Sequence, residues 1–316
     1  MHEVFTLNAS DGATLHVHRW SCATPVKAVV MLAHGMAEHA ARYAEFGQAL
    51  SAAGIELYAH DQRGHGLTAR HGITGHLADQ EGWQRVLDDL HALQQLIRSR
   101  HPHTPIILFG HSMGSFIAQA YLLQHSADLH AAILSGSNYQ PLAVYRAARL
   151  IARFERWRQG PTGYSALIDW LSFGSFNKAF QPNRTPFDWL SRDAAQVDAY
   201  IADPLCGFRC TNQLWIDLLG GLQTITPVAS LARIAPQLPL LVIGGECDPV
   251  SGGKRLMHLA AALRRAGLQQ IDVTLYPGAR HEVLHETHRA DVIEHLIDWL
   301  NQSLAASRPS IAKETA

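Results

Sequence analysis

The chain has 316 residues, of which 47% are hydrophobic and 17% are charged, and its formal net charge is −1. These values are typical of a compact globular protein, and the near-neutral charge argues against nucleic-acid binding. No apolar run reaches the roughly 20 residues that cross a bilayer, and the first residues lack the basic and apolar segments of a signal peptide. We therefore expect a cytoplasmic protein with four free cysteines.

The first part of the chain alternates predicted strands and helices. Residues 3–9 and 14–20 alternate in hydropathy around Asp11-Gly12, which predicts a β-hairpin. Later apolar runs predict strands at 26–33, 55–60, 106–109 and 130–134, and helical periodicity predicts helices at 42–53, 83–99 and 116–123. This alternation is typical of parallel βαβ units with helices on both faces of one sheet.

The alternation stops between residues 139 and 227, where the sequence predicts helices and no strand. Candidate helices cover 141–159, 185–202 (with Thr185 as N-cap and Pro186 at the first position) and 209–219. Strands at 238–245 and 271–276 and helices at 254–266 and 290–305 restore the rhythm. We predict a doubly wound, mostly parallel α/β core in two parts, 1–138 and 228–306, a helical cap insertion at 139–227, and a disordered tail at 307–316.

The segment from residue 106 to 115 carries the strongest chemical signal. Four apolar residues lead into Gly110-His111-Ser112-Met113-Gly114, and a helical pattern follows. Strand, Gly-x-Ser-x-Gly and helix in this order are typical of a nucleophile elbow, a turn so tight that both flanking positions require glycine. Ser112 is therefore the candidate nucleophile, and His111 is expected to pack behind it.

A serine nucleophile needs a base and a group that orients the base, and both candidates follow downstream strands. Asp248 lies just after the strand at 238–245, and His281 lies just after the strand at 271–276. Glu246 is the alternative acid, and His285 and His288 are alternative bases. We favour Asp248 and His281, because loops at the carboxyl ends of parallel strands build the sites of such sheets.

Ester or amide chemistry also needs donors for the oxyanion of the tetrahedral intermediate. In this architecture they are the backbone N–H after the nucleophile and one from an earlier strand loop. The corresponding residues are Met113 and Met36, the latter preceded by Gly35.

With these residues assigned, the sequence resembles the monoacylglycerol lipase and lysophospholipase branch of the α/β-hydrolases. The matching segments are 34–39 (HGMAEH) with Arg42-Tyr43, 61–66 (DQRGHG), 110–115 (GHSMGS), the Asp248 and His281 loops, and 187–193 and 203–207 in the insertion. Leu67-Thr68 departs from the pattern of many relatives. The resemblance implies a serine hydrolase acting on a carboxylic ester of one acyl chain, with the insertion as a cap. It also implies that Glu38, His39, Asp61, Arg63 and His65 hold the loops beneath the site.

The twenty histidines raise the question of a metal site. No pair among His34, His39, His60, His65, His71 and His76 shows ligand spacing with a third residue in a recognisable frame, so we expect neither metal nor cofactor. Cys206 and Cys210 are four residues apart, and we expect them to pack on one helical turn rather than bind an ion.

The predicted helix at 141–159 is amphipathic and basic. Arg146, Arg149, Arg153 and Arg156 share one face, and Val144, Ala147, Leu150, Ile151 and Phe154 share the other. Such a helix could contact an anionic membrane transiently, but we favour a cap helix that packs its apolar face on the core.

Other functions remain compatible with the same residues. A carboxylesterase, thioesterase or amidase would use the same triad on another small substrate, and a non-catalytic binding protein would keep only the fold. An epoxide hydrolase is disfavoured, because those enzymes carry aspartate where this chain has Ser112.

Overall fold

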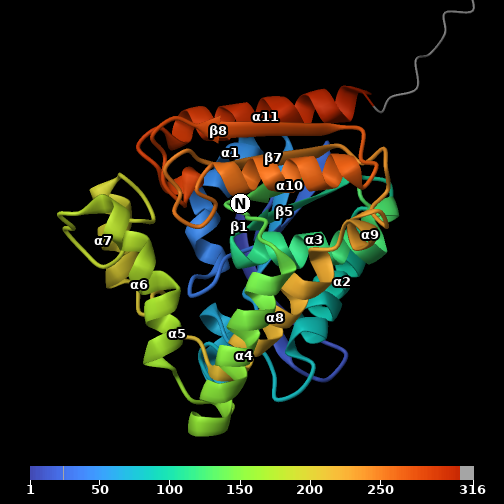
Figure 1. The fold of residues 1–316 in the computed structure, drawn as a ribbon. Helices are drawn as coiled ribbons and strands as arrows, with labels where there is room; N and C mark the ends of the chain where they lie inside the picture. The colour runs from blue at the N-terminus through green and yellow to red at the C-terminus, as the bar shows by residue number, and fades with distance from the viewer. Residues whose placement is uncertain (24, 307–316) are drawn as a thin grey trace, which may run out of the picture.

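The computed structural model describes residues 1–23 and 25–306, so the predicted tail at 307–316 lies outside the described residues. Eight strands form one sheet in the order β1-β2-β4-β3-β5-β6-β7-β8 (Figure 1). The strands are β1 (His2–Asn8), β2 (Thr14–Trp20), β3 (Ala28–Ala33), β4 (Ile55–His60), β5 (Ile106–His111), β6 (Ala131–Ser135), β7 (Leu240–Gly245) and β8 (Ile271–Tyr276). Only the pairings of β2 with β1 and β4 are antiparallel. The predicted mostly parallel α/β fold is confirmed.

The sheet is buried on both faces because helices cover both. All residues of β3, β4, β5, β6 and β7 are buried, as their continuous apolar runs predict. One face packs against α1 (Ala44–Ala52) and α11 (Arg289–Ala306), and the other against α2 (Gly82–Arg100), α3 (Met113–His125) and α10 (Lys254–Arg265). In Figure 1, α11 lies along the top of the molecule, above β8.

The strand register brings the candidate site together. Ala33 of β3 lies beside Gly110 of β5, and His111 lies beside Ser135 of β6. Because parallel strands end at one edge, the loops after β3, β5, β6, β7 and β8 share that edge. These loops carry the residues that the sequence singles out for chemistry.

The segment between β6 and β7 contains no strand, and its longer helices lie at the left and lower centre of Figure 1. They are α4 (Leu142–Gln159), α5 (Ala166–Leu171), α6 (Phe173–Phe176), α7 (Ala194–Ala202) and α8 (Asn212–Ile225), followed by the short α9 (Val228–Leu231). α4 packs along α8, and α8 in turn packs on α3 and α2.

The helix predicted at 185–202 is shorter than expected. Its first half is a turn, because the Asp188 carboxylate accepts hydrogen bonds from the N–H groups of Arg184 (2.6 Å) and Thr185 (3.1 Å). This local pairing competes with helix formation. The helix begins only at Ala194, where Asp193 rather than Thr185 is the N-cap.

The next cap helix also starts later than predicted. Thr211 caps α8 by accepting a hydrogen bond from the N–H of Leu214 (3.2 Å), so the helix begins at Asn212. Cys206 and Cys210 precede it in a loop, and the prediction that they share a helical turn is wrong.

The prediction that α4 packs its apolar face on the core is also wrong. Leu150 is 65% exposed, Phe154 54% and Trp157 80%. The helix instead buries Tyr145 and Ala152. The burial side of α4 is set by contact with α8, which periodicity within α4 alone does not reveal.

Candidate active site

Ser112 occupies the strained turn that the glycine pattern predicts. It lies between the last residue of β5 and the first residue of α3, with φ 51° and ψ −120°. A non-glycine residue rarely adopts positive φ, and it persists only when its surroundings hold it. Here the Ser112 N–H donates to the carbonyl of Ser135 (2.9 Å), and the N–H of Ser115 donates to the Ser112 carbonyl (2.8 Å).

The two flanking glycines are required by space. A Cβ on Gly110 would lie 2.5 Å from the Gly114 carbonyl oxygen, and one on Gly114 would lie 2.0 Å from the Ala33 carbonyl oxygen. Either atom would displace backbone, so α3 can approach β3 and β5 only with glycine at both positions.

The structure brings Asp248 and His281 together. His281 Nδ1 and Asp248 Oδ1 are 3.0 Å apart, and both side chains are buried. Burial alone would lower the pKa of His281, but the Asp248 carboxylate and its hydrogen bond outweigh burial and raise that pKa above its ordinary value. Asp248 is oriented in turn, because its Oδ1 accepts from the N–H of Val250 (2.8 Å).

The alternative acid and bases lie elsewhere. Glu246 is exposed and accepts a hydrogen bond from the N–H of Gly278 (3.1 Å). His285 Nε2 contacts the Arg42 carbonyl (3.2 Å), and His288 Nδ1 contacts Arg192 (2.9 Å). The geometry therefore favours Asp248 and His281.

Three residues, Trp189, His111 and Gly136, surround His281. The ring of Trp189 lies 5.1 Å from that of His281, and the ring of His111 lies 4.9 Å from it on centroid distance. Gly136 has φ +58°, and a Cβ there would lie 3.0 Å from His281 Cε1. The signal for Gly136 was present, because it directly follows the buried strand β6.

Ser112 and His281 line the same pocket. In the part of the chain that the structure describes, no hydrogen bond joins the Ser112 hydroxyl to the His281 ring. Such contacts are often long without substrate and shorten when substrate binds.

Met36 lines the pocket together with Ser112, and Met113 directly follows Ser112 at the start of α3. Their backbone N–H groups have no acceptor among the described residues. A Cβ on Gly35 would lie 3.2 Å from Ser112 Cβ, which shows how closely this loop approaches the nucleophile. Ala37, which follows Met36, has φ 57°, so the backbone of this loop is strained beside Met36.

Two cap residues hold this strained loop. The Ala37 carbonyl accepts hydrogen bonds from the Tyr200 hydroxyl (2.9 Å) and from the N–H of Gly207 (3.0 Å). The segment after β3 is therefore fixed to the segment around α7, although 163 residues separate Ala37 from Tyr200.

A buried ion network joins the loop after β3 that carries Met36 (the Met36 loop) to the loop after β8 that carries His281 (the His281 loop). Glu38 accepts from the N–H of Gly35 (2.5 Å) and from Arg42 (2.7 Å), and Arg42 also donates to both oxygens of Glu282 (2.6 and 2.7 Å). Burial alone would raise the pKa of Glu38 and Glu282, but Arg42 and the neighbouring histidines together outweigh burial and lower the pKa of both. Arg42 thus fixes the relative position of the two loops.

The loop after β4 contacts the segment that follows β3. Asp61 accepts from the N–H groups of Ala40 (2.8 Å) and Leu67 (2.7 Å), and Arg63 pairs with Asp89 (2.6 Å). These contacts are structural and do not reach the pocket.

The pocket at this edge has a volume of about 340 Å³. Core and cap both contribute to its wall, which is largely apolar; its apolar residues include Met36, Phe173, Trp189, Leu190 and Phe208. Its charged residues Glu38, Asp169, Arg209 and Glu282 all have an oppositely charged neighbour, since Arg42 bonds to both glutamates and Asp169 lies 3.4 Å from Arg209.

Comparison with known proteins agrees with the fold. The family model described as serine aminopeptidase, S33, matches residues 24–288. The monoacylglycerol lipase of Mycolicibacterium smegmatis is 30% identical over 89% of this chain and 90% of the relative. Human monoglyceride lipase is 26% identical over 94% of this chain and 90% of its own length. A carboxyl esterase from Bacillus coagulans superposes with a TM-score of 0.89 at 24% identity, covering 96% of this chain and 99% of that chain.

Proposed function

Because this chain belongs to the serine aminopeptidase S33 family of hydrolases, we propose that it hydrolyses the carboxylic ester of monoacylglycerols. The observation that carries the proposal is a largely apolar pocket with Ser112 and His281 in its wall. The resemblance over nearly full length to proteins named monoacylglycerol lipase supports the same substrate class.

In the proposed mechanism, Ser112 attacks the ester carbonyl while His281 accepts its proton. Asp248 holds the imidazole in position and stabilises its charged form. The N–H groups of Met36 and Met113 donate to the oxyanion. His281 then protonates the leaving glycerol and activates a water that releases the fatty acid from Ser112.

The substrate is expected to be uncharged. Arg209 in the pocket wall and Arg42 beside its glutamates are both engaged by carboxylates, so neither arginine is offered as a free cation to the phosphate of a lysophospholipid headgroup. Burying an unpaired substrate charge there would be costly. We therefore favour monoacylglycerols over lysophospholipids.

We assign residues 139–227 the role of a cap that shapes the acyl site. Phe173, Trp189 and Phe208 from this segment line the pocket with the core residues, and apolar side chains of this kind suit a fatty acyl chain.

A substrate panel tests this function. Purified protein is incubated with monoacylglycerols, lysophosphatidylcholines, triacylglycerols, acyl-coenzyme A thioesters and aminoacyl anilides, and acid or amine release is measured. We expect the highest kcat/KM on monoacylglycerols. A higher kcat/KM on anilides would assign an amidase, and turnover of none of these classes would contradict the proposal.

We further propose that the cap contacts anionic membranes through α4. The face formed by Leu150, Phe154 and Trp157 is exposed, and Arg153 and Arg156 are exposed on the same helix. Exposed apolar residues flanked by arginines match the interface of an anionic bilayer, where monoacylglycerols reside. No helix in the described part of the chain meets the length and hydropathy of a membrane span.

Vesicle sedimentation tests this contact. We expect wild-type protein to bind vesicles containing phosphatidylglycerol more than pure phosphatidylcholine vesicles, and less at high salt. The double variant Phe154→Ala/Trp157→Ala should bind at least roughly ten-fold less. Met257→Ala removes an apolar side chain that is 46% exposed outside the cap, and it should bind as wild type does. Equal loss in both variants would contradict an α4 interface.

A further inference from the structure

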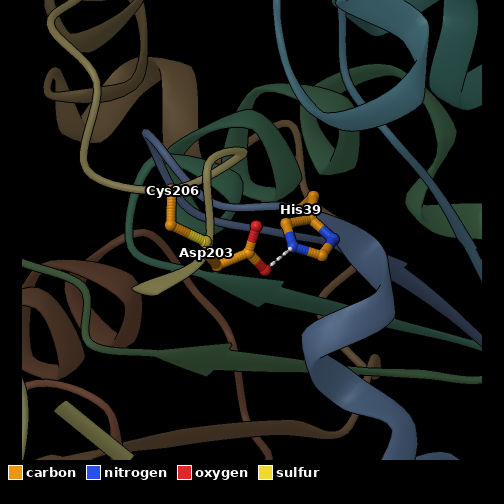
Figure 2. Close-up of side chains that lie close together, drawn as sticks. All are labelled: His39, Asp203 and Cys206. Atoms are coloured by element: carbon orange, nitrogen blue, oxygen red, sulfur yellow. Dashed lines mark hydrogen bonds and ion pairs between the residues drawn. The ribbon is translucent and has the colours of Figure 1, made fainter. Parts of the chain in front are cut away.

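Three potential metal ligands meet at the junction of the cap and the Met36 loop. His39 follows that loop, and Asp203 and Cys206 lie in the loop after α7 (Figure 2). His39 Nε2 lies 2.8 Å from Asp203 Oδ2, and the ligand atoms of all three residues lie within 4.8 Å of one another. The sequence did not reveal this group, because 164 residues separate His39 from Asp203.

The donor set and its spacing suit a divalent cation of intermediate softness, such as Zn²⁺. An imidazole nitrogen, a carboxylate oxygen and a thiolate sulfur are all zinc ligands. With Zn–N of about 2.0 Å and Zn–S of about 2.3 Å, the donors of a tetrahedral site lie roughly 3.3–3.7 Å apart. The distances between ligand atoms therefore need to change by at most about 1.5 Å, and a water would take the fourth position.

The turn that carries two of the ligands is already ordered. The Asp203 Oδ1 accepts from the N–H of Leu205 (2.8 Å), and the Asp203 carbonyl accepts from the N–H of Cys206 (3.0 Å). The carboxylate is thus held with its other oxygen toward His39. Such supporting hydrogen bonds orient ligands and reduce the entropy that binding costs.

The local charges also accept a dication. Arg42, the cation near Cys206, is already paired with Glu38 and Glu282. An Asp203 carboxylate and a Cys206 thiolate would together neutralise a divalent ion. Binding would release the thiol proton, and the His39 Nε2 lone pair would face the ion with any ring proton on Nδ1.

We propose that His39, Asp203 and Cys206 bind Zn²⁺ or a chemically similar divalent cation. The ion would link the 203–207 segment to the Met36 loop, beside the bond from the Gly207 N–H to the Ala37 carbonyl. This link stabilises the folded chain because the ion binds the folded state alone. The proposal does not depend on the hydrolase function, since ion binding is measured without substrate.

Cobalt substitution tests the site directly. Metal-free protein is titrated with Co²⁺, and we expect a near-ultraviolet thiolate-to-cobalt charge-transfer band that saturates at one ion per chain. Cys206→Ser should lose this band and Asp203→Asn should weaken binding, whereas Cys22→Ser and Cys247→Ser should retain it. A band that persists in Cys206→Ser, or no band in wild type, would overturn the proposal.

A second measurement uses only the wild-type chain. Zn²⁺ should slow the alkylation of Cys206 by iodoacetamide, as mapped by peptide mass spectrometry, while the partly or fully exposed Cys22 and Cys247 react at unchanged rates. It should also raise the Tm. Unchanged alkylation of Cys206 at saturating Zn²⁺ would overturn the site even if a variant fails to fold.

Discussion

At the residue scale, His281 combines deep burial with the ability to carry a charge. A buried imidazole resists protonation, but the Asp248 carboxylate at 3.0 Å reverses the effect and raises the pKa of His281 above 6.5. The charged form is therefore stabilised, as proton transfer from Ser112 requires. Because only neutral His281 can accept that proton, activity should rise with pH through this raised pKa.

The Asp248→Asn variant should separate these contributions. Without the carboxylate, burial remains and lowers the pKa of His281, so the acid limb of kcat/KM moves to lower pH. The loss of orientation should lower kcat by about 10³–10⁴-fold. The pH profile of ester hydrolysis measures both effects. Glu246→Gln removes an exposed carboxylate two residues away and should leave the pH profile unchanged. A larger effect of Glu246→Gln than of Asp248→Asn would make Glu246 the acid.

Gly136→Ala should impair catalysis more than folding. Its Cβ would lie 3.0 Å from His281 Cε1 and 3.1 Å from His111 Cε1, so the imidazole must shift. The positive φ adds roughly 1–2 kcal/mol of strain. Gly12→Ala is the control, because Gly12 has φ +85° with nothing within 4 Å of a Cβ. Both variants should lower Tm, but only Gly136→Ala should reduce kcat/KM; equal activity in the two would contradict this role.

The sequence predicted the residues that carry reactive atoms and only some of those that position them. Ser112, Asp248 and His281 follow strands in a recognisable order, and the structure brings the last two into contact. Arg42 and Glu282 were missed as partners, because 240 residues separate them and no local pattern announces a long-range ion pair.

At the element scale, the cap and the Met36 loop are coupled. Tyr200 and Gly207 both donate to the carbonyl of Ala37, whose backbone is strained. The cap thus contributes to the geometry of the proposed oxyanion hole in addition to lining the pocket. A shift of α7 would be transmitted directly to Met36.

Tyr200→Phe should therefore lower kcat. Loss of one buried hydrogen bond of about 1–1.5 kcal/mol corresponds to roughly a ten-fold lower kcat if the bond acts on the transition state. Steady-state kinetics on a soluble ester provide kcat and KM separately. Tyr164→Phe is the matched control, since its hydroxyl also donates from the cap to a carbonyl, that of Thr74 (3.1 Å), away from the pocket. An equal fall in both variants would indicate general loosening of the cap.

Element boundaries were least predictable in the cap. The core helices follow from periodicity because each lies on a sheet that fixes its buried side. In the cap, Asp188 replaces a helical turn with side-chain hydrogen bonds, and α8 determines which face of α4 is buried. Both outcomes depend on tertiary partners, which a single segment does not encode.

At the scale of the whole molecule, the strand order explains the site. The loops after five strands meet at one edge, so residues from 36 to 281 along the chain surround one pocket. This arrangement follows from alternating strands and helices and could be predicted. The His39–Asp203–Cys206 group could not, because it arises where a cap loop happens to reach a core loop.

The central claim is that Ser112 is the nucleophile of a monoacylglycerol hydrolase. The most direct measurement is fatty-acid release from a monoacylglycerol by wild type and Ser112→Ala, with Tm and circular dichroism verifying the fold. We predict loss of roughly 10⁴-fold or more in kcat with an unchanged fold. Activity within ten-fold of wild type in a folded Ser112→Ala protein would contradict the account.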